Sequence, residues 1–413
     1  MAARRATLLL AGSAGLSNLL GLVFTVVIAH ALGAERYGSL AALISAFLVV
    51  SIAGSALQIT VARETSLEVM HHDGGIAHNV HAWILRLALV IVAAAVLGIL
   101  LRQPLADLVG VGGEPWAAAA IFASGAAWLL LSTLRGVLQG LGRFGWVATS
   151  IAGEAALRLV IAATLVAAGG GVTGAFLGSG FSVVAMAAIL TLPIGSSLRD
   201  LAERNGLREP SGADHSLGSI ALRSWPALIA LTLVALLQNS DVIMVKRNAA
   251  EIVAGAYAAN SVAAKVVVWV AIGLGLWVVP ETARRGPGRE ALGVLGRVLG
   301  LLAAAGTVMV LVYLVAGKPL LRIGFGEEFD IESASLPVLA AAMVLLSMSY
   351  VVTQHFLALG RRVFLALLAL AVLVQLVALQ SVAHSAAETA STLLAINAVL
   401  LAALGGLALS GRG

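Results

Sequence analysis

The sequence predicts an all-α integral membrane protein with about 12 transmembrane helices in two parallel six-helix lobes. Its composition predicts the class, because hydrophobic residues make up 60% of the 413 positions and charged residues 11%, and the mean hydropathy is +1.03. Soluble domains contain about 45 to 50% apolar and about 25% charged residues. The two lobes are predicted by a segment of the first half that recurs in the second half.

The recurring segment occupies residues 38–65, GSLAALISAFLVVSIAGSALQITVARET, and residues 255–282, GAYAANSVAAKVVVWVAIGLGLWVVPET. Each copy begins with a Gly, continues through a long apolar run and ends in Glu-Thr, with the same spacing in both copies. The copies are separated by about half the chain length. We therefore interpret the chain as two related halves with pseudo-two-fold symmetry.

Membrane-spanning helices need about 20 predominantly apolar residues each. The first half contains six such segments, at residues 7–31, 39–62, 82–101, 116–134, 147–168 and 172–193. The second half contains six more, at residues 220–245, 254–279, 292–316, 334–357, 363–379 and 387–409. The first segment is longer than the apolar region of a signal peptide, about 7 to 15 residues, so we expect it to be a retained helix.

The two halves meet in a polar connection. We predict an N-terminal lobe at residues 1–193 with helices 1–6, a cytoplasmic inter-lobe linker at residues 194–219, and a C-terminal lobe at residues 220–413 with helices 7–12. The linker mixes Gly, Ser, Pro and charged residues, which is typical of a flexible or partly helical tether. Because each half has an even number of spans, the halves enter the membrane in the same direction and are related by an axis along the membrane normal.

The basic residues predict the orientation in the membrane. With the N-terminus in the cytoplasm, the inner side receives Arg4, Arg5, Arg63, Arg86, Arg135, Arg143, Arg199, Arg204, Arg208, Arg223, Arg284, Arg285, Arg289, Arg297, Arg361, Arg362 and Arg412. The outer side receives the smaller set Arg36, Arg102, Lys246, Arg247, Lys318 and Arg322. This distribution follows the positive-inside rule. Both termini are therefore predicted to be cytoplasmic.

Two basic residues, Arg158 and Lys265, are assigned to neither side because they lie well within predicted spans, and each needs a reason, because a charge at mid-bilayer costs about 2.5 to 3.5 kcal/mol. Arg158 follows Glu154 by one helical turn, so the two side chains can pair on one face of the fifth span. Lys265 lies within the eighth span, where its same-face neighbours carry no countercharge, and Asp241 on the seventh span is a candidate partner. Each pair is either a structural ion pair or part of a cationic cavity that contacts an anionic lipid carrier.

Uncharged polar residues in the spans include Asn18, Gln58 and Asn239 on the first, second and seventh spans. Hydrogen bonding between helices is the commoner role of such residues. Substrate binding is the alternative, and we include all three in the candidate cavity.

Several classes of function lack support in the sequence. The chain has no Cys, which excludes disulfides, thiolate catalysis and Cys-based zinc sites. Its positive charges lie in short breaks between apolar runs rather than on one soluble face, so we expect no nucleic-acid partner. We predict no catalytic residue, no metal site and no cofactor.

Four stretches resemble a known family. The residues ALGAERYGSLAALISAFLVVSIAGSALQITVARET and QNSDVIMVKRNAAEIVAGAYAANSVAAKVVVWVAIGLGLWVVPETARR are similar to corresponding hairpins in the two lobes of the polysaccharide-export (Wzx-like) flippases of the multidrug/oligosaccharidyl-lipid/polysaccharide (MOP) superfamily. The FGEEF motif at residues 325–329 and GEAALRLV at residues 153–160 also resemble that family. The resemblance implies a MATE-like fold of two lobes that moves polyprenyl-diphosphate-linked saccharides by alternating access.

The resemblance also implies partners and a location. We expect a lipid-linked saccharide substrate, contact with membrane lipids, and a place in the cytoplasmic membrane of a bacterium, while a coupling ion and polysaccharide-assembly enzymes stay open as further partners. Two other functions remain open. A MATE-type drug/cation antiporter would need an interior carboxylate, for which Glu154 and Asp241 are the candidates, and a membrane-embedded polysaccharide polymerase would more typically carry a large outer loop.

Overall fold

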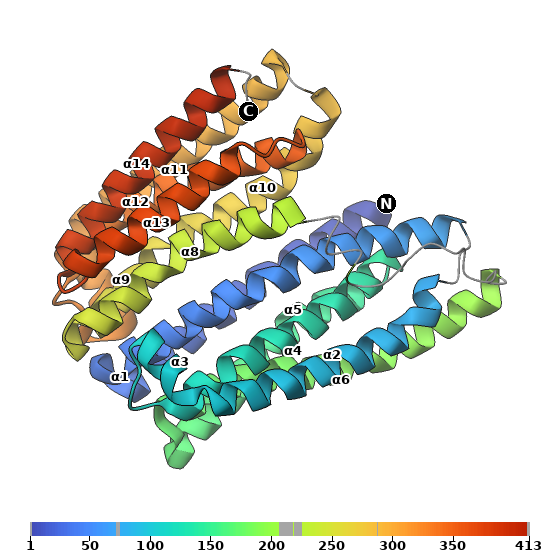
Figure 1. Cartoon of the computed structure of the whole chain (residues 1–413), viewed down its shortest axis with the longest axis horizontal. Helices are drawn as coiled ribbons and strands as arrows, with labels where there is room; N and C mark the ends of the chain where they lie inside the picture. The colour runs from blue at the N-terminus through green and yellow to red at the C-terminus, as the bar shows by residue number, and fades with distance from the viewer. Residues whose placement is uncertain (1, 72–74, 206–217, 219–224, 287, 411–413) are drawn as a thin grey trace. The chain divides into compact units, whose positions relative to one another are not determined.

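The protein is described by a computed structural model that covers residues 2–71, 75–205, 218, 225–286 and 288–410. These residues form α-helices joined by short turns, with single turns of 3₁₀ and π helix and no strand in the described ranges. Figure 1 shows the helices as long, roughly aligned rods within each half of the chain. The all-α class predicted from composition is therefore confirmed.

The described helices contain the twelve predicted spans. The six of the first half lie in α1 (Ala2–His71), which contains two, α2 (Gly75–Leu100), α4 (Pro115–Gly140), α5 (Phe144–Leu165) and α6 (Gly171–Asn205). Those of the second half are α8 (Trp225–Asn248), α9 (Glu251–Ala264) with α10 (Val266–Arg285), α11 (Arg289–Phe325), α12 (Leu336–Ala358), α13 (Phe364–Val382) and α14 (Ala386–Ser410). The seventh span was predicted from residue 220, but residues 220–224 lie outside the described ranges.

Glycines separate spans that follow each other without a loop. Gly33 divides α1 with φ 73° and ψ 168°, a conformation that residues with a Cβ rarely adopt. A π turn, Val166–Gly170, joins α5 to α6, and Gly169 within it has φ 90°. These two breaks turn ten long apolar helical stretches into twelve spans.

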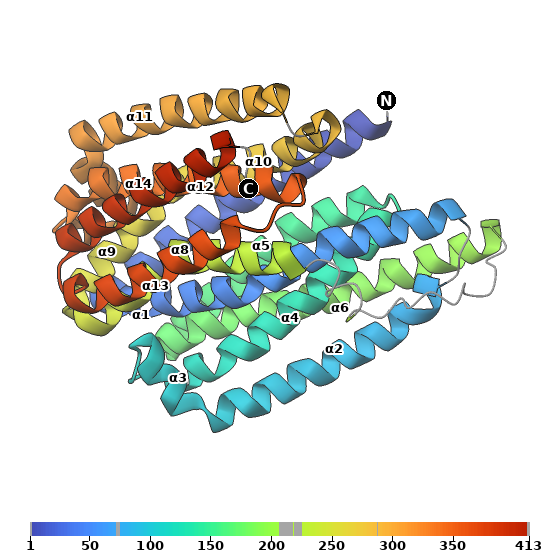
Figure 2. The ribbon, with the colours of Figure 1, turned by 45° about the horizontal axis from the view of Figure 1, so that its top comes forward.

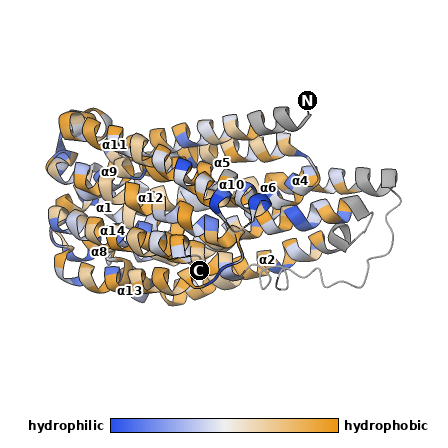
Figure 3. Ribbon diagram, turned by 90° about the horizontal axis from the view of Figure 1, so that it is seen from above, coloured by the Kyte–Doolittle hydropathy of each residue, from blue (hydrophilic) through white to orange (hydrophobic). Residues whose placement is uncertain are grey.

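Large apolar side chains are exposed on several helices. Figure 3 colours most of the ribbon as hydrophobic. Leu89 on α2 is 70% exposed, Val315 on α11 is 88% exposed and Val377 on α13 is 72% exposed. Water would solvate such a surface poorly, whereas hydrocarbon tails match it. The chain is therefore a multi-pass membrane protein.

The chain divides into two compact units, which we describe separately. Unit 1 comprises Met1–Ala31 and Val50–Leu228, and unit 2 comprises Leu32–Val49 and Ile229–Gly413. The second part of α1 therefore begins within unit 2 and continues in unit 1. The predicted lobe boundaries stay a prediction. Helix α6 continues beyond residue 193 to Asn205, so the first part of the predicted linker is helical, whereas residues 206–217 lie outside the described ranges.

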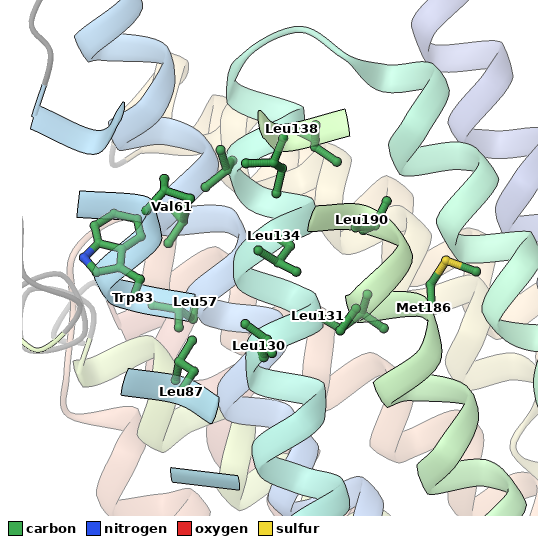
Figure 4. Packing of buried hydrophobic residues seen from close by; sticks show 14 of the residues in the cluster. Leu57, Val61, Trp83, Leu87, Leu130, Leu131, Leu134, Leu138, Met186 and Leu190 are labelled. Atoms are coloured by element: carbon green, nitrogen blue, oxygen red, sulfur yellow. The ribbon is translucent and has the colours of Figure 1, made fainter. Parts of the chain in front are cut away.

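Unit 1 is built around α4, which packs against α2, α5, α6 and the short outer helix α3 (Arg102–Val109). Figure 4 shows the apolar core between α1, α2, α4 and α6, whose members include Leu57, Val61, Trp83, Leu87, Leu130, Leu131, Leu134, Leu138, Met186 and Leu190. Close approach requires a glycine at one point, because a Cβ on Gly98 of α2 would lie 2.0 Å from the carbonyl oxygen of Ala119 on α4. Small residues thus bring α2 against α4.

Unit 2 is built around α12, which packs against α9, α10, α11 and α14, while α13 packs on α14 (Figure 2). Helices α4 and α12 are the fourth spans of their halves, and they are the most buried among the described spans. Within their most apolar stretches, 72% of residues are buried in α4 and 78% in α12. The same place in each half is therefore occupied by the same kind of helix, as the internal repeat predicts.

The two glycines that begin the copies of the repeat touch each other within unit 2. A Cβ on Gly38 would lie 3.0 Å from the backbone nitrogen of Gly255, and a Cβ on Gly255 would lie 1.9 Å from the carbonyl oxygen of Ala34. The start of the second part of α1 therefore packs directly against α9 in unit 2.

Candidate functional site

Glu154 in unit 1 is a buried carboxylate with a partner on each side. It lies on α5 with 7% of its side chain exposed, and its Oε1 is 3.9 Å from Arg158 Nε, as the four-residue spacing predicts. The hydroxyl of Ser182 on α6 donates to the same oxygen at 3.2 Å. The Glu154 carboxylate is therefore neutralised by Arg158 and held toward α6.

Arg158 is the more accessible member of this pair. Its side chain is 29% exposed, and its Cζ lies 5.4 Å from the ring centre of Phe24 on α1. A Cβ on Gly21 would lie 3.8 Å from Arg158 Nη2, so the guanidinium packs against α1 at a position that has no side chain. Its Nε is buried and makes no hydrogen bond. Arg158 is thus a partly exposed cation with a donor that is still unused.

Arg135 belongs to the same group. It was counted among the cytoplasmic charges, and in the structure it lies in the last part of α4 with 4% exposure. Its Nε donates to the Ser150 hydroxyl at 2.9 Å, its Nη2 donates to the Ser150 carbonyl oxygen at 2.8 Å, and its Cζ lies 5.4 Å from the Trp128 ring centre. It also interacts electrostatically with Glu154. Two arginines of unit 1 therefore lie near the Glu154 carboxylate.

Asp241 in unit 2 is fully buried and is contacted by three side chains of the eighth span. The hydroxyl of Tyr257 donates to Oδ2 at 2.9 Å, the hydroxyl of Ser261 donates to Oδ2 at 3.4 Å, and Lys265 Nζ lies 3.5 Å from Oδ1. Asp241 is 0% exposed and the Lys265 side chain 11% exposed. The pairing of Lys265 with Asp241, one of the two alternatives from the sequence, is therefore present.

The helix of the eighth span is interrupted at Lys265. Helix α9 ends at Ala264 and α10 begins at Val266, and Lys265 between them has φ −78° and ψ −3°. No Gly or Pro causes this break. The hydroxyl of Tyr313 on α11 donates to the carbonyl oxygen of Ala263 at 2.9 Å, so it satisfies backbone that the break exposes. The break places the ammonium at the C-terminal end of α9.

The uncharged polar residues predicted for the cavity have local or structural contacts. Asn18 on α1 is exposed. Gln58 donates to Gln139 Oε1 at 3.3 Å, and Asn239 donates to the carbonyl oxygen of Ala235 on its own helix at 2.9 Å. Gln58 therefore joins α1 to α4, and Asn239 folds back onto α8. Asn18 alone of these three is open to a ligand.

The sequence analysis did not single out other buried polar residues. Gln375 on α13 donates to Leu237 O and to Ser240 Oγ, both at 2.9 Å, and so ties α13 to α8. Asn260 donates to Glu332 O at 2.7 Å and to Ser335 Oγ at 3.0 Å. Each lies in an apolar run, and an isolated amide residue in such a run could have marked both from the sequence as buried hydrogen-bonding residues. These bonds hold the helices around the Asp241 site.

Outside the spans, the Glu-Thr ends of the repeat are polar anchors. In the second copy, Arg285 donates to Glu281 Oε1 through Nε at 2.8 Å and through Nη2 at 2.6 Å, and these bonds hold the pKa of Glu281 below its ordinary value. Thr282 is fully buried, and its hydroxyl lies 3.4 Å from His355 Nδ1 on α12. Thr65 ends the first copy and is also buried. Both copies therefore end by packing a threonine inside their unit.

Comparison with known proteins identifies the fold. No known protein family matches the chain, and no curated protein sequence matches it either. Among solved structures, the lipid II flippase MurJ in an inward closed conformation has a TM-score of 0.72 and 12% sequence identity, covering 96% of this chain and 86% of that chain.

Two further matches are transporters of the MATE family. An inward-facing multidrug resistance transporter of the MOP superfamily has a TM-score of 0.68 and 14% identity, covering 96% of this chain and 95% of that chain. A Vibrio cholerae MATE transporter in a bent form has a TM-score of 0.56 and 14% identity, covering 100% and 98%. The predicted fold class is confirmed: this chain has the MATE-like fold that MurJ and the MATE transporters share.

Proposed function

We propose that this protein is a flippase that moves a polyprenyl-diphosphate-linked saccharide across the cytoplasmic membrane of a bacterium by alternating access. The similarity of its fold to a lipid II flippase and to a MATE transporter supports transport as its function. Two arginines near Glu154, Arg135 and Arg158, support an anionic substrate, because they add positive charge to this part of unit 1. The Arg158 side chain is 29% exposed, and this single observation of an accessible interior cation carries the proposal.

Arg158 is suited to bind a diphosphate. A guanidinium offers donors in a planar fork that matches phosphate oxygens, and such charge-assisted bonds are about twice as strong as neutral ones. Low-dielectric surroundings strengthen the attraction further. Glu154 orients the guanidinium from α5, and the ring of Phe24 supports it from α1. The saccharide would follow the diphosphate through the protein while the prenyl chain stays in lipid.

The alternative function, a MATE-type drug/cation antiporter, has less support from these contacts. Such a protein needs an interior carboxylate that is free to take a proton, a sodium ion or a cationic drug. Both candidates already have cationic partners, since Glu154 lies 3.9 Å from Arg158 and Asp241 lies 3.5 Å from Lys265. An export cycle for cations would first have to break one of these pairs.

The decisive experiment is transport of labelled lipid-linked oligosaccharide in proteoliposomes. Arg158→Gln should reduce transport at least tenfold, because the loss of a charge-assisted hydrogen bond worth about 1.5 to 3 kcal/mol lowers the affinity for the diphosphate. Glu154→Gln should retain part of the activity. Arg86→Gln, at an exposed position on α2, is the matched control and should transport normally.

The opposite outcome is equally clear. The antiporter would be supported if the wild-type protein in proteoliposomes exchanged a cationic dye for protons or sodium and Glu154→Gln abolished this exchange. If the wild-type protein also failed to move the lipid-linked oligosaccharide, the proposal would be overturned. The finer assignments rest on the same proposal. These are membership of the polysaccharide-export family, cytoplasmic termini, and partnership with polysaccharide-assembly enzymes.

A further inference from the structure

We propose that the ammonium of Lys265 is a built-in occupant of a monovalent-cation site formed by Asp241, Tyr257 and Ser261. In this view unit 2 carries its own cation, tethered to the chain, in a position where an alkali ion would otherwise be held. The inference concerns a site inside unit 2, and it does not depend on which substrate the protein moves.

The oxygen atoms around Asp241 are the ligands that an alkali or other hard cation prefers. Asp241 supplies a carboxylate with no exposed surface, and the hydroxyls of Tyr257 and Ser261 lie 2.9 and 3.4 Å from its Oδ2. Hydroxyl oxygens have lone pairs as well as a donor hydrogen, so they can turn from donating to the carboxylate to coordinating a cation. Lys265 Nζ now lies 3.5 Å from the other carboxylate oxygen.

The interrupted helix adds a second cation-favouring feature. The C-terminal end of a helix carries partial negative charge, and Lys265 is the first residue after the end of α9. The carbonyl oxygen of Ala263 in this last turn accepts a hydrogen bond from the hydroxyl of Tyr313 on α11. In transporters, a transmembrane helix interrupted near a buried carboxylate is a common place for a cation to bind.

Burial explains why something must fill this position. A fully buried carboxylate without a counter-ion is strongly unfavourable, so Asp241 must be paired with a cation or take up a proton. In the native chain Lys265 supplies the cation, and therefore no sodium is needed here. Removing the ammonium while keeping the oxygen atoms should leave a vacant position beside the negatively charged Asp241 carboxylate, which a sodium ion can fill.

The test is sodium binding to the purified full-length protein in detergent. Lys265→Met keeps most of the alkyl chain and removes the charge, and it should bind about one sodium ion per chain, whereas the wild type binds none at this site. Its thermal midpoint should rise when sodium chloride replaces choline chloride at equal ionic strength. Lys265→Ala serves as a second variant of the same design.

Two controls separate a specific site from general charge effects. Asp241→Asn combined with Lys265→Met removes both charges, so it should fold and should show neither sodium binding nor a sodium-dependent midpoint. Lys246→Met removes a second buried lysine of unit 2, whose partner Glu251 is 63% exposed and therefore remains solvated. That variant should show no sodium-specific response.

The result that overturns the proposal is a sodium-independent Lys265→Met variant. Equal midpoints in sodium and choline, with no bound sodium, would mean that Asp241 and Lys265 form an ordinary structural pair. The same conclusion follows if the single variants fail to fold in either salt while the double variant folds, because the bare carboxylate would then have accepted no cation.

Discussion

At the residue scale, three cations, Arg158, Lys265 and Arg135, show how much the sequence could predict. The Glu154–Arg158 pair follows from helical spacing, and it was predicted. The partner of Lys265 could be proposed because few interior carboxylates exist, but the distance to Asp241 needed the fold. The partner of Arg135 was not predicted, because Ser150 lies on another helix and no sequence pattern marks it. Local pairs are readable from sequence, whereas pairs across helices are not.

Arg135 should matter for stability more than for transport. Arg135→Gln removes two buried charge-assisted hydrogen bonds to Ser150, and we expect it to lower the free energy of unfolding by about 3 kcal/mol. Arg86→Gln, at an exposed position on α2, should change it by less than about 0.5 kcal/mol. Unfolding titrations in mixed micelles measure both. Equal stability of the two variants would show that the Ser150 contact contributes little.

At the element scale, hydropathy predicted every span and missed what interrupts them. A run of apolar residues is enough to place a helix in hydrocarbon, since the backbone must be satisfied internally. It does not reveal the break at Lys265, because no Gly or Pro marks it. Nor did it predict the short helix α3 (Arg102–Val109). Breaks made by tertiary contacts, such as the one from Tyr313, leave no local signal.

Gly255 should tolerate no larger side chain. A Cβ there would lie 1.9 Å from the Ala34 carbonyl oxygen, so Gly255→Val must push the two helices apart, at a cost of about 3 kcal/mol or loss of folding. Gly273→Val is the control, because no atom lies within 4 Å of a Cβ at that position. Thermal midpoints of the two purified variants provide the comparison. A Gly255→Val protein as stable as the control would contradict the close contact.

At the scale of the whole molecule, the MATE-like fold was predictable, because the recurring Gly-to-Glu-Thr spacing indicated two halves of six spans each. The burial of α4 and α12, the fourth span of each half, agrees with that expectation among the described spans. The membership of residues 32–49 in unit 2 was not predictable, because sequence continuity assigns them to the first half. Which unit a helix packs with depends on long-range contacts that a hydropathy profile does not contain.

The orientation in the membrane can be tested directly, because the chain has no Cys. Single cysteines at Gly113, Gly170 and Glu327 should react with an impermeant thiol reagent added outside, while cysteines at Gly74 and Gly212 should react only after the membrane is opened. The excess of arginine on the inner side is the physical reason. Labelling at Gly212 in sealed cells would reverse the predicted topology.

The contact between Gly38 and Gly255 also links the evolution of the two halves. After a duplication, two copies of a segment are usually free to diverge, but here a Cβ on Gly38 would meet Gly255 and Ala254, and a Cβ on Gly255 would meet Ala34, one helical turn before Gly38. A side chain accepted at either glycine would require the two helices to separate, so substitutions at the two sites should be epistatic. The glycines at the start of the repeat are thus under a shared steric constraint, while the helices that follow them are free to drift apart.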